Sequence, residues 1–147
     1  MKISTKGRYG LRAMVDLAAN TKEGAVSLVN IANRQKLSLN YLEQVFAALR
    51  KAGLVRSIKG PQGGYMLAGD AQSIKIGDIL TVLEGKFSIV DGAWPGREPD
   101  PVQAVIKELV WDKIDRQIQG FLDAVTLADL VERYQKLNIG EGNMYYI

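Results

Sequence analysis

The sequence contains no cysteine and no histidine in its 147 residues. These two side chains supply the usual ligands of zinc, haem and iron–sulfur sites, so such metal centres have no plausible donors. Their absence also removes the thiolate nucleophile and the imidazole base, which excludes most enzyme classes. No stretch approaches the run of about 20 apolar residues that a membrane span requires, and the N-terminus has no apolar run of signal-peptide length. We therefore expect a cytoplasmic protein with no catalytic site, no metal and no cofactor.

Acidic residues are scarce in the first half of the chain. Residues 1–67 contain eleven Lys and Arg against three acids, a net charge of +8, whereas the remaining residues carry 8 basic and 13 acidic side chains, a net charge of −5. A cationic excess confined to one half is typical of a surface that approaches phosphate. The alternative is that single charges merely solvate helix surfaces, and the confinement to one half favours nucleic acid over it.

Hydrophobic spacing predicts a helix, a short second helix over residues 28–36, a turn around residues 37–40 and a third helix over residues 40–52. The first helix begins at Ser4 or Thr5, and the third ends at Gly53 as its C′ glycine. The side chains expected to face the core are Leu11, Met14, Val15 and Ala18 in the first helix, Leu28, Ile31 and Ala32 in the second, and Leu42, Val45, Phe46 and Leu49 in the third.

The start of the third helix allows two different N-caps. Asn40 with Glu43 three residues later has the form of a capping box, in which Glu43 bonds to the backbone. Ser38 is the other possible cap. The sequence leaves this choice open, and the choice decides whether Glu43 is available for other contacts.

A change of period after Gly53 predicts a β-hairpin. Residues 54–58 and 65–68 are short strand-like runs, and the turn between them has Pro61 and Gly63 at the spacing of a type I turn. This glycine-rich turn lacks the Gly-Lys-Ser/Thr ending of a phosphate-binding loop, so a nucleotide site is not expected. Two helices joined by a tight turn and followed by a hairpin form a winged helix-turn-helix domain, a mainly α fold with a small β-hairpin wing.

The second half of the sequence predicts assembly elements. We expect the DNA-binding domain over residues 1–70, a linker with one short helix and a proline-rich loop over 71–101, dimerisation helices over 102–138 and a flexible tail over 139–147. A helix over residues 102–125 spans about 36 Å, more than a small domain needs to cover itself. Its role as an intramolecular core helix is the alternative. The apolar stripe expected at the dimer interface comprises Ile106, Leu109, Val110, Ile114, Ile118, Phe121 and Leu122.

The polar face of the third helix is the candidate for reading base edges in the major groove. The residues expected there are Asn40, Tyr41, Glu43 and Gln44, and Lys59 at the wing turn is expected to enter the minor groove. Other residues are expected to contact the DNA backbone without reading sequence. They are Lys2, Thr5, Lys6, Arg8, Tyr9, Arg12, Lys51 and Arg56.

Three segments resemble the Rrf2 family of bacterial transcription regulators. They are MKISTKGRYGLRAM at the start, LSLNYLEQVFAALRKAGLV in the helix-turn-helix and SIKGPQGGYMLA in the wing. The resemblance covers residues 1–85 closely and continues through the long helix. It implies a dimer formed through that helix, binding to palindromic operators and, usually, repression. It also implies base reading by Asn40, Tyr41, Glu43 and Gln44, with Lys59 where many members have arginine.

Family members that sense through an iron–sulfur cluster hold it with cysteines between the short helix and the long one, and this chain has none there. Among cluster-free members it is most similar to the CymR type, the repressors of cysteine metabolism, in its first residues and its closing MYYI. That resemblance implies a signal relayed by cysteine synthase (O-acetylserine thiol-lyase). The tail residues Met144, Tyr145, Tyr146 and Ile147 are the candidates for docking, because a terminal carboxylate can be captured by backbone amides. A frayed or locally packed terminus is the alternative.

Two further readings of the sequence remain. A small molecule could bind directly between the wing and the long helix, where Trp94 and Trp111 could line a pocket, although packing is their commoner role. The chain could also be an interaction protein that has kept the fold and lost DNA binding. Its retained positive charge argues against that reading.

Overall fold

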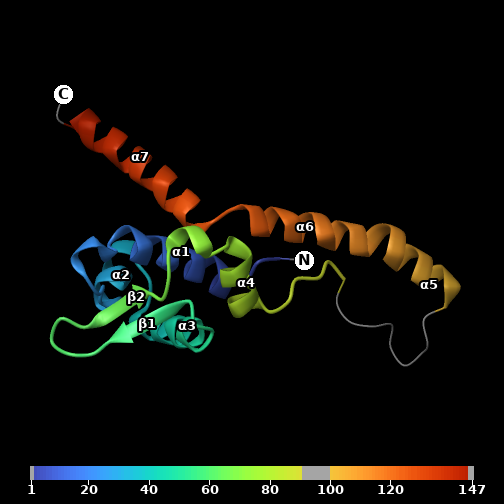
Figure 1. The fold of residues 1–147 in the computed structure, drawn as a ribbon, viewed down its shortest axis with the longest axis horizontal. Helices are drawn as coiled ribbons and strands as arrows, with labels where there is room; N and C mark the ends of the chain where they lie inside the picture. Colours follow the sequence, from blue (N-terminus) through green and yellow to red (C-terminus); the bar gives the residue numbers. More distant parts are fainter. Residues whose placement is uncertain (1, 91–99, 146–147) are drawn as a thin grey trace.

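The computed structural model describes residues 2–90 and 100–145, with side chains up to Asn138 (Figure 1). Most elements are helical. The helices are α1 (Thr5–Ala19), α2 (Leu28–Gln35), α3 (Leu39–Lys51), α4 (Ile76–Glu84), α5 (Pro101–Ile106), α6 (Asp112–Ala124) and α7 (Leu127–Tyr145). A π-helical turn, η3 (Lys107–Trp111), joins α5 to α6, and short 3-10 helices occur at η1 (Thr21–Glu23) and η2 (Ala71–Ser73). The strands are β1 (Val55–Ile58) and β2 (Gly64–Leu67).

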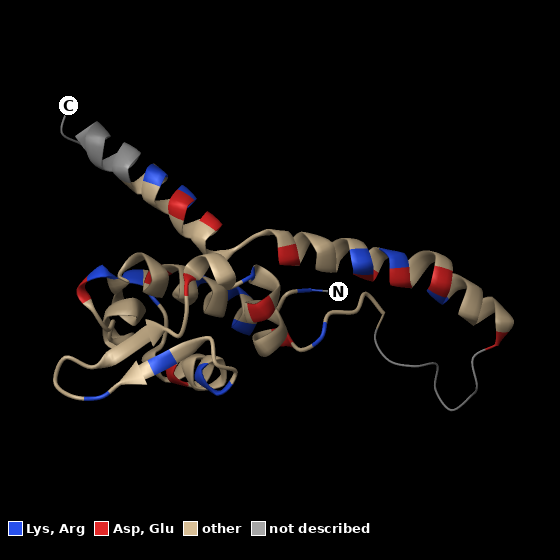
Figure 2. Ribbon diagram, in the orientation of Figure 1, with Lys and Arg blue, Asp and Glu red and all other residues tan. Residues whose placement is uncertain are grey.

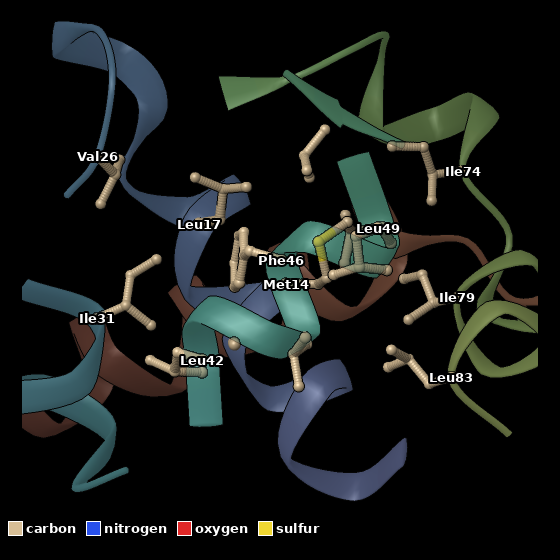
Figure 3. Close-up of a cluster of buried hydrophobic side chains, with 14 of the residues drawn as sticks. Met14, Leu17, Val26, Ile31, Leu42, Phe46, Leu49, Ile74, Ile79 and Leu83 are labelled. Carbon is tan, nitrogen blue, oxygen red and sulfur yellow. The ribbon is translucent and has the colours of Figure 1, made fainter. Parts of the chain in front are cut away.

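The core forms around α3, whose predicted apolar stripe is fully buried. Leu42, Val45, Phe46 and Leu49 have no exposed surface. Phe46 and Met14 of α1 lie near the middle of the cluster in Figure 3. Because these residues recur on one face of the helix, they fix its rotation and leave the opposite face to solvent.

The buried face of α1 differs from the predicted one. Of the four expected residues only Met14 is fully buried, and Leu11, Val15 and Ala18 are half-buried at the edge of the cluster. Ala13 and Leu17 take the central places. The reason is that Gly7 and Gly10 bring α1 close to α4, which turns this face of the helix inward.

The core also extends beyond residue 70, where we expected a linker. Ile74, Ile79 and Leu83 of the α4 region and Leu127 of α7 belong to the same buried cluster. Backbone bonds from Ile76 N–H to the Val125 carbonyl at 2.9 Å and from Leu127 N–H to the Ile74 carbonyl at 2.8 Å tie these segments together. α4 therefore shares the core of the winged domain, because it supplies apolar surface against which α1 is buried.

The hairpin confirms the predicted wing. Its strands are antiparallel, with Val55 opposite Leu67 and Ile58 opposite Gly64. In the turn, Gly63 N–H donates to the Gly60 carbonyl at 2.9 Å, as the predicted spacing requires. The wing is also bound to the domain, because Val26 forms an antiparallel bridge with Tyr65.

The predicted long helix is present as the succession of α5, the π turn and α6. Asp100 caps it by accepting the Gln103 N–H at 2.7 Å, and Pro101 occupies its first turn. The succession extends to one side of the winged domain, while α7 leaves the domain in another direction (Figure 1). At its C-terminal end α6 lies against α4, where a Cβ added to Gly77 would be 2.9 Å from Asp123 Oδ1.

The last helix is longer than expected. α7 continues to Tyr145, whereas the sequence predicted a short helix followed by a flexible tail from residue 139. Glycines at positions 140 and 142 are the reason for that expectation. Each costs a helix only about 1 kcal/mol relative to alanine, which weakens helical structure without breaking it. Tyr146 and Ile147 lie outside the described residues.

Candidate nucleic-acid interface

Ser38 caps the candidate recognition helix α3. Its hydroxyl oxygen accepts the Tyr41 backbone N–H at 3.3 Å. Before it, Lys36 ends α2 in the left-handed conformation with φ 57°, which makes the turn between the two helices tight. At the other end, Gly53 N–H donates to the Arg50 carbonyl at 2.9 Å and Leu54 N–H to the Leu49 carbonyl at 3.0 Å, a Schellman motif that confirms the predicted glycine C-cap.

The open face of α3 carries most of the predicted base-reading residues. Asn40, Glu43 and Gln44 are exposed, as is Lys51 near the end of the helix. Within the part of the chain that the structure describes, Glu43 has no hydrogen bond or ion pair, so it takes no part in a capping box. A carboxylate on this face can accept from a cytosine amino group, and a glutamine can pair with adenine.

Tyr41 does not belong to this open face. The side chain is half-buried beside the core, its ring stands edge-on to Tyr9 at 6.1 Å between centroids, and its hydroxyl is buried without a partner in the described region. Burial, followed by the nearby charge of Glu84, raises the pKa of Tyr41. The predicted role of Tyr41 in base reading therefore has no support in the geometry, and the residue joins α3 to α1 instead.

The N-terminal segment and α1 present the predicted backbone-contacting residues to solvent. Arg8 Nη2 donates to Thr5 Oγ1 at 3.3 Å, and the Arg8 guanidinium lies 6.0 Å from the centre of the Tyr9 ring. These contacts hold one cation near the surface of the helix. The exposed residues of the set are Lys2, Thr5, Lys6, Arg8, Tyr9 and Arg12.

Sequence reasoning missed Glu84, the last residue of α4, whose carboxylate contacts the start of α1. Its Oε1 accepts from the Ser4 hydroxyl at 2.6 Å, the Ser4 N–H at 2.8 Å and the Gly7 N–H at 3.0 Å. Ser4 occupies the N-cap position of α1 yet makes no cap bond within its own helix. The only sequence signal for this contact is the pair of glycines, Gly7 and Gly10, spaced to let another element approach one face of α1.

The two cations predicted on the wing are exposed to solvent. Lys59 is exposed at the turn, and Arg56 is exposed on β1, where its Nη2 lies 3.8 Å from Met66 Sδ across the hairpin. Figure 2 shows basic segments on the hairpin and around α3, and segments of both signs along the long helix. The winged domain is thus the part of the described chain that combines exposed cations with an open helix face.

No metal or membrane feature appears in the described residues. Residues 2–90 and 100–145 contain no group of three His, Cys, Asp or Glu placed to hold a metal ion. In the same part of the chain, no helix has the length and apolar character needed to cross a membrane.

A capped recognition helix, a basic wing and a cationic first helix define a DNA-binding transcription regulator of the winged-helix class. The chain belongs to the Rrf2 family. The family model, described as an iron-dependent transcriptional regulator, matches residues 3–133. The predicted family and fold are confirmed.

Curated and solved relatives agree with this assignment. The transcriptional regulator IscR of Serratia proteamaculans is 39% identical over 142 residues, which cover 96% of this chain and 85% of that protein. The structure of CymR, the global cysteine regulator of B. subtilis, is 44% identical with a TM-score of 0.76, over 90% of this chain and 98% of that one. The structure of T. potens IscR is 46% identical with a TM-score of 0.75, over 99% and 97%.

The iron named in the family description does not fit the donors of this chain. An iron–sulfur cluster is held by cysteine thiolates, sometimes with histidine, and the sequence has neither residue. The segment over residues 91–99, where cluster ligands would be expected, lies outside the described residues but likewise contains no cysteine. The function proposed for this chain therefore includes no iron-dependent step.

Proposed function

We propose that this chain is a homodimeric repressor that binds a palindromic operator and controls genes of cysteine and sulfur metabolism in the bacterial cytoplasm. The observation that carries the proposal is the open face of α3, where Asn40, Glu43 and Gln44 are exposed on a helix whose other face is fully buried. A recognition helix fixed in this way can enter the major groove without rearrangement.

The long helix supports the dimer. Leu109 is 54% exposed and Phe121 is 68% exposed, and Ile106 and Val110 are 39% and 40% exposed. Ile114, Ile118 and Leu122 are half-buried. An apolar stripe of this length is unfavourable in water, and a second copy can cover it by presenting the same stripe in return. Two recognition helices related by a two-fold axis would then meet two half-sites of a palindrome.

The cations support a division of roles on the DNA. Lys2, Lys6, Arg8 and Arg12 would contact phosphates on one side of α3, and Lys59 would enter the minor groove from the wing. Backbone contacts supply affinity that falls with salt, whereas the polar residues of α3 supply the choice of sequence.

The metabolic role is supported by likeness to CymR together with composition. The B. subtilis CymR structure is described as that of a global cysteine regulator. This chain resembles it closely and lacks the thiolates with which a cluster-based sensor would work. Regulation through a partner protein therefore fits this chain better than regulation through a bound cluster.

The proposed relay is cysteine synthase, docked on the C-terminal residues Met144, Tyr145, Tyr146 and Ile147. The side chains of these residues lie outside the described part of the structure. The aromatic and aliphatic side chains of this segment suit anchoring in an apolar pocket of a partner protein. Deleting Ile147 is expected to abolish co-purification with the synthase, and undiminished co-purification would refute the relay.

The whole proposal is tested by footprinting the purified protein on genomic fragments upstream of sulfur-metabolism genes, with and without cysteine synthase and O-acetylserine. We expect a protected palindrome whose occupancy changes when synthase and O-acetylserine are added together. A direct response to a small molecule without the synthase would favour a sensor that binds its effector itself. A slope of log affinity against log salt near zero would indicate a protein that does not bind DNA.

A further inference from the structure

The first turn of α1 depends on one carboxylate from a distant helix. Three donors, the Ser4 hydroxyl, the Ser4 N–H and the Gly7 N–H, meet on a single oxygen of Glu84 at 2.6 to 3.0 Å. The first N–H groups of any helix lack partners within the helix, and an acid near them is favoured by the helix dipole. Glu84 thus does for α1 what the Ser4 side chain would otherwise do.

The sequence of α1 leaves space for this contact, because glycine occupies the two positions that face α4. A Cβ on Gly7 would overlap the Glu84 carboxylate, and a Cβ on Gly10 would overlap the side chain of Leu83. Any residue larger than glycine at either position would require the Glu84 or Leu83 side chain to move away. Both glycines are buried, so α1 is in close contact with α4 at these two positions.

Glu84 can hold α1 because α4 is itself fixed on two sides. Ile79 is fully buried and Leu83 is 6% exposed, both in the core of the winged domain. On another side, a Cβ on Gly77 would lie 3.3 Å from both Gln119 Nε2 and Leu122 Cβ of α6. The carboxylate therefore connects the cationic end of α1 with a helix that is packed in the core and also contacts the long helix.

We infer that Glu84 is a positioning residue for DNA binding, which orders the N-terminal segment so that Lys2, Lys6 and Arg8 meet phosphates together. This inference rests on the proposed DNA-binding function. An acid beside these cations would by itself repel DNA, so we expect it to have a structural role that offsets this repulsion. That role is to order a segment whose backbone would otherwise fray. Each cation that is held against a phosphate then contributes to affinity by releasing counterions from the DNA.

The test uses the full chain and the duplex that the wild-type protein selects from a random-sequence pool. Affinity is measured over a series of salt concentrations for the wild type, Glu84→Ala, Glu84→Gln and Asp78→Ala. Glu84→Ala is expected to bind about tenfold more weakly at low salt, with a slope of log affinity against log salt shallower by about 0.9 for each phosphate that the variant no longer neutralises. Its order of preference among operator variants is expected to stay unchanged, because α3 is untouched.

Two variants distinguish the positioning role of Glu84 from the effect of its charge and from a general loss of stability. Glu84→Gln keeps an oxygen that accepts the same donors, so it is expected to bind within about threefold of the wild type and with its slope. Asp78→Ala removes an acid from the same helix, where Asp78 accepts only the Lys75 N–H at 3.0 Å within the described region. It is expected to keep the wild-type slope.

A wild-type slope for Glu84→Ala, tighter binding by that variant, or an equal loss in Glu84→Gln would overturn the inference. If Glu84→Ala does not fold, Ser4→Ala tests the same contact by removing one donor, and an unchanged slope there counts against the inference. A wild-type protein that selects no sequence would overturn the proposed function as well, which distinguishes the two failures.

Discussion

The Ser38 hydroxyl caps α3 by accepting the backbone N–H of Tyr41 at 3.3 Å. With the cap supplied by Ser38, the polar groups of Asn40 and Glu43 are not needed to complete the helix. They remain on the exposed face, where a recognition helix meets base edges. One local hydrogen bond thus leaves Glu43 free for the base-reading role proposed for it.

Replacing Glu43 with alanine is expected to relax sequence preference without loss of stability. The carboxylate has no partner in the described part of the chain, so unfolding by urea should change by no more than about 0.5 kcal/mol. Discrimination at one base pair of each half-site should fall by about 1 to 3 kcal/mol, measured by competition between operator variants. A large loss of stability with unchanged preference would place Glu43 in the fold instead of the interface.

Replacing Tyr41 with phenylalanine is expected to leave DNA binding unchanged and stability unchanged or slightly higher at neutral pH. The hydroxyl is buried without a partner in the described region, so its removal relieves a desolvation cost. Chiefly because of burial, the pKa of Tyr41 is raised in the folded protein. The stability that is linked to this raised pKa is therefore fully present below about pH 10, the pKa of tyrosine in the unfolded chain. It is lost as pH rises through the pKa of the folded state.

Thermal unfolding of the wild type and of Tyr41→Phe from pH 7 to 11 checks this expectation. The wild type should lose stability relative to the variant only above about pH 10. A change in operator preference caused by removal of the hydroxyl would show instead that Tyr41 contacts bases.

Removing the Arg34 guanidinium is expected to destabilise the domain by about 2 to 3 kcal/mol, less than for a fully buried pair because Arg34 is partly exposed. Asp16 is 2% exposed. Its carboxylate accepts hydrogen bonds from Arg34 Nη2 at 2.7 Å and from Gln35 Nε2 at 2.8 Å. The hydrogen bond to Asp16 raises the pKa of Arg34, as expected for a paired cation. Arg34→Ala would leave a carboxylate buried between α1 and α2 with only amide partners.

Lys107→Ala is the matched control in the same urea titration. It breaks the pair between Lys107 Nζ and Asp112 at 3.0 Å, whose side chains are 68% and 41% exposed, so the expected change is below about 0.5 kcal/mol. Equal effects of the two substitutions would contradict the importance of the buried pair.

Replacing Leu109 with glutamate is expected to give a monomer that binds the operator at least tenfold more weakly, because two linked half-sites bind more tightly than one. Leu109 is 54% exposed on the π turn of the long helix. Sedimentation measures the oligomeric state directly. Val29→Glu, at an apolar residue of α2 that is 50% exposed, should leave the dimer intact. A dimeric Leu109→Glu protein would place the interface elsewhere.

The elements that local patterns describe could be predicted from the sequence. The stripe from Leu42 to Leu49 repeats at helical spacing, and its members are all buried. The turn with Pro61 and Gly63 needs only local chemistry, and its hydrogen bond is present. The exposure of Asn40 and Gln44 followed from the same spacing, because a helix that buries one face presents the other.

Contacts between distant residues could not be predicted in this way. Ser4 and Glu84 are 80 positions apart, and nothing in the local pattern of either residue specifies the other. By sequence, Asp16 is one of the few acids that oppose the basic half, whereas in the structure it is buried against Arg34. The position of Tyr41 at the start of α3 predicts a place on the open face, yet its ring packs against Tyr9. In each case tertiary packing decided the role of a polar side chain.

The most direct test of DNA reading by α3 is selection from a random-sequence duplex pool by the wild type and by a protein with Asn40→Ala, Glu43→Ala and Gln44→Ala combined. We predict that the wild type enriches inverted half-sites with centres one or more helical turns of DNA, each about 10 to 10.5 base pairs, apart. The combined variant should still bind DNA with a similar salt slope and enrich no sequence. Enrichment of the same sites by both proteins would contradict the assignment of base reading to α3.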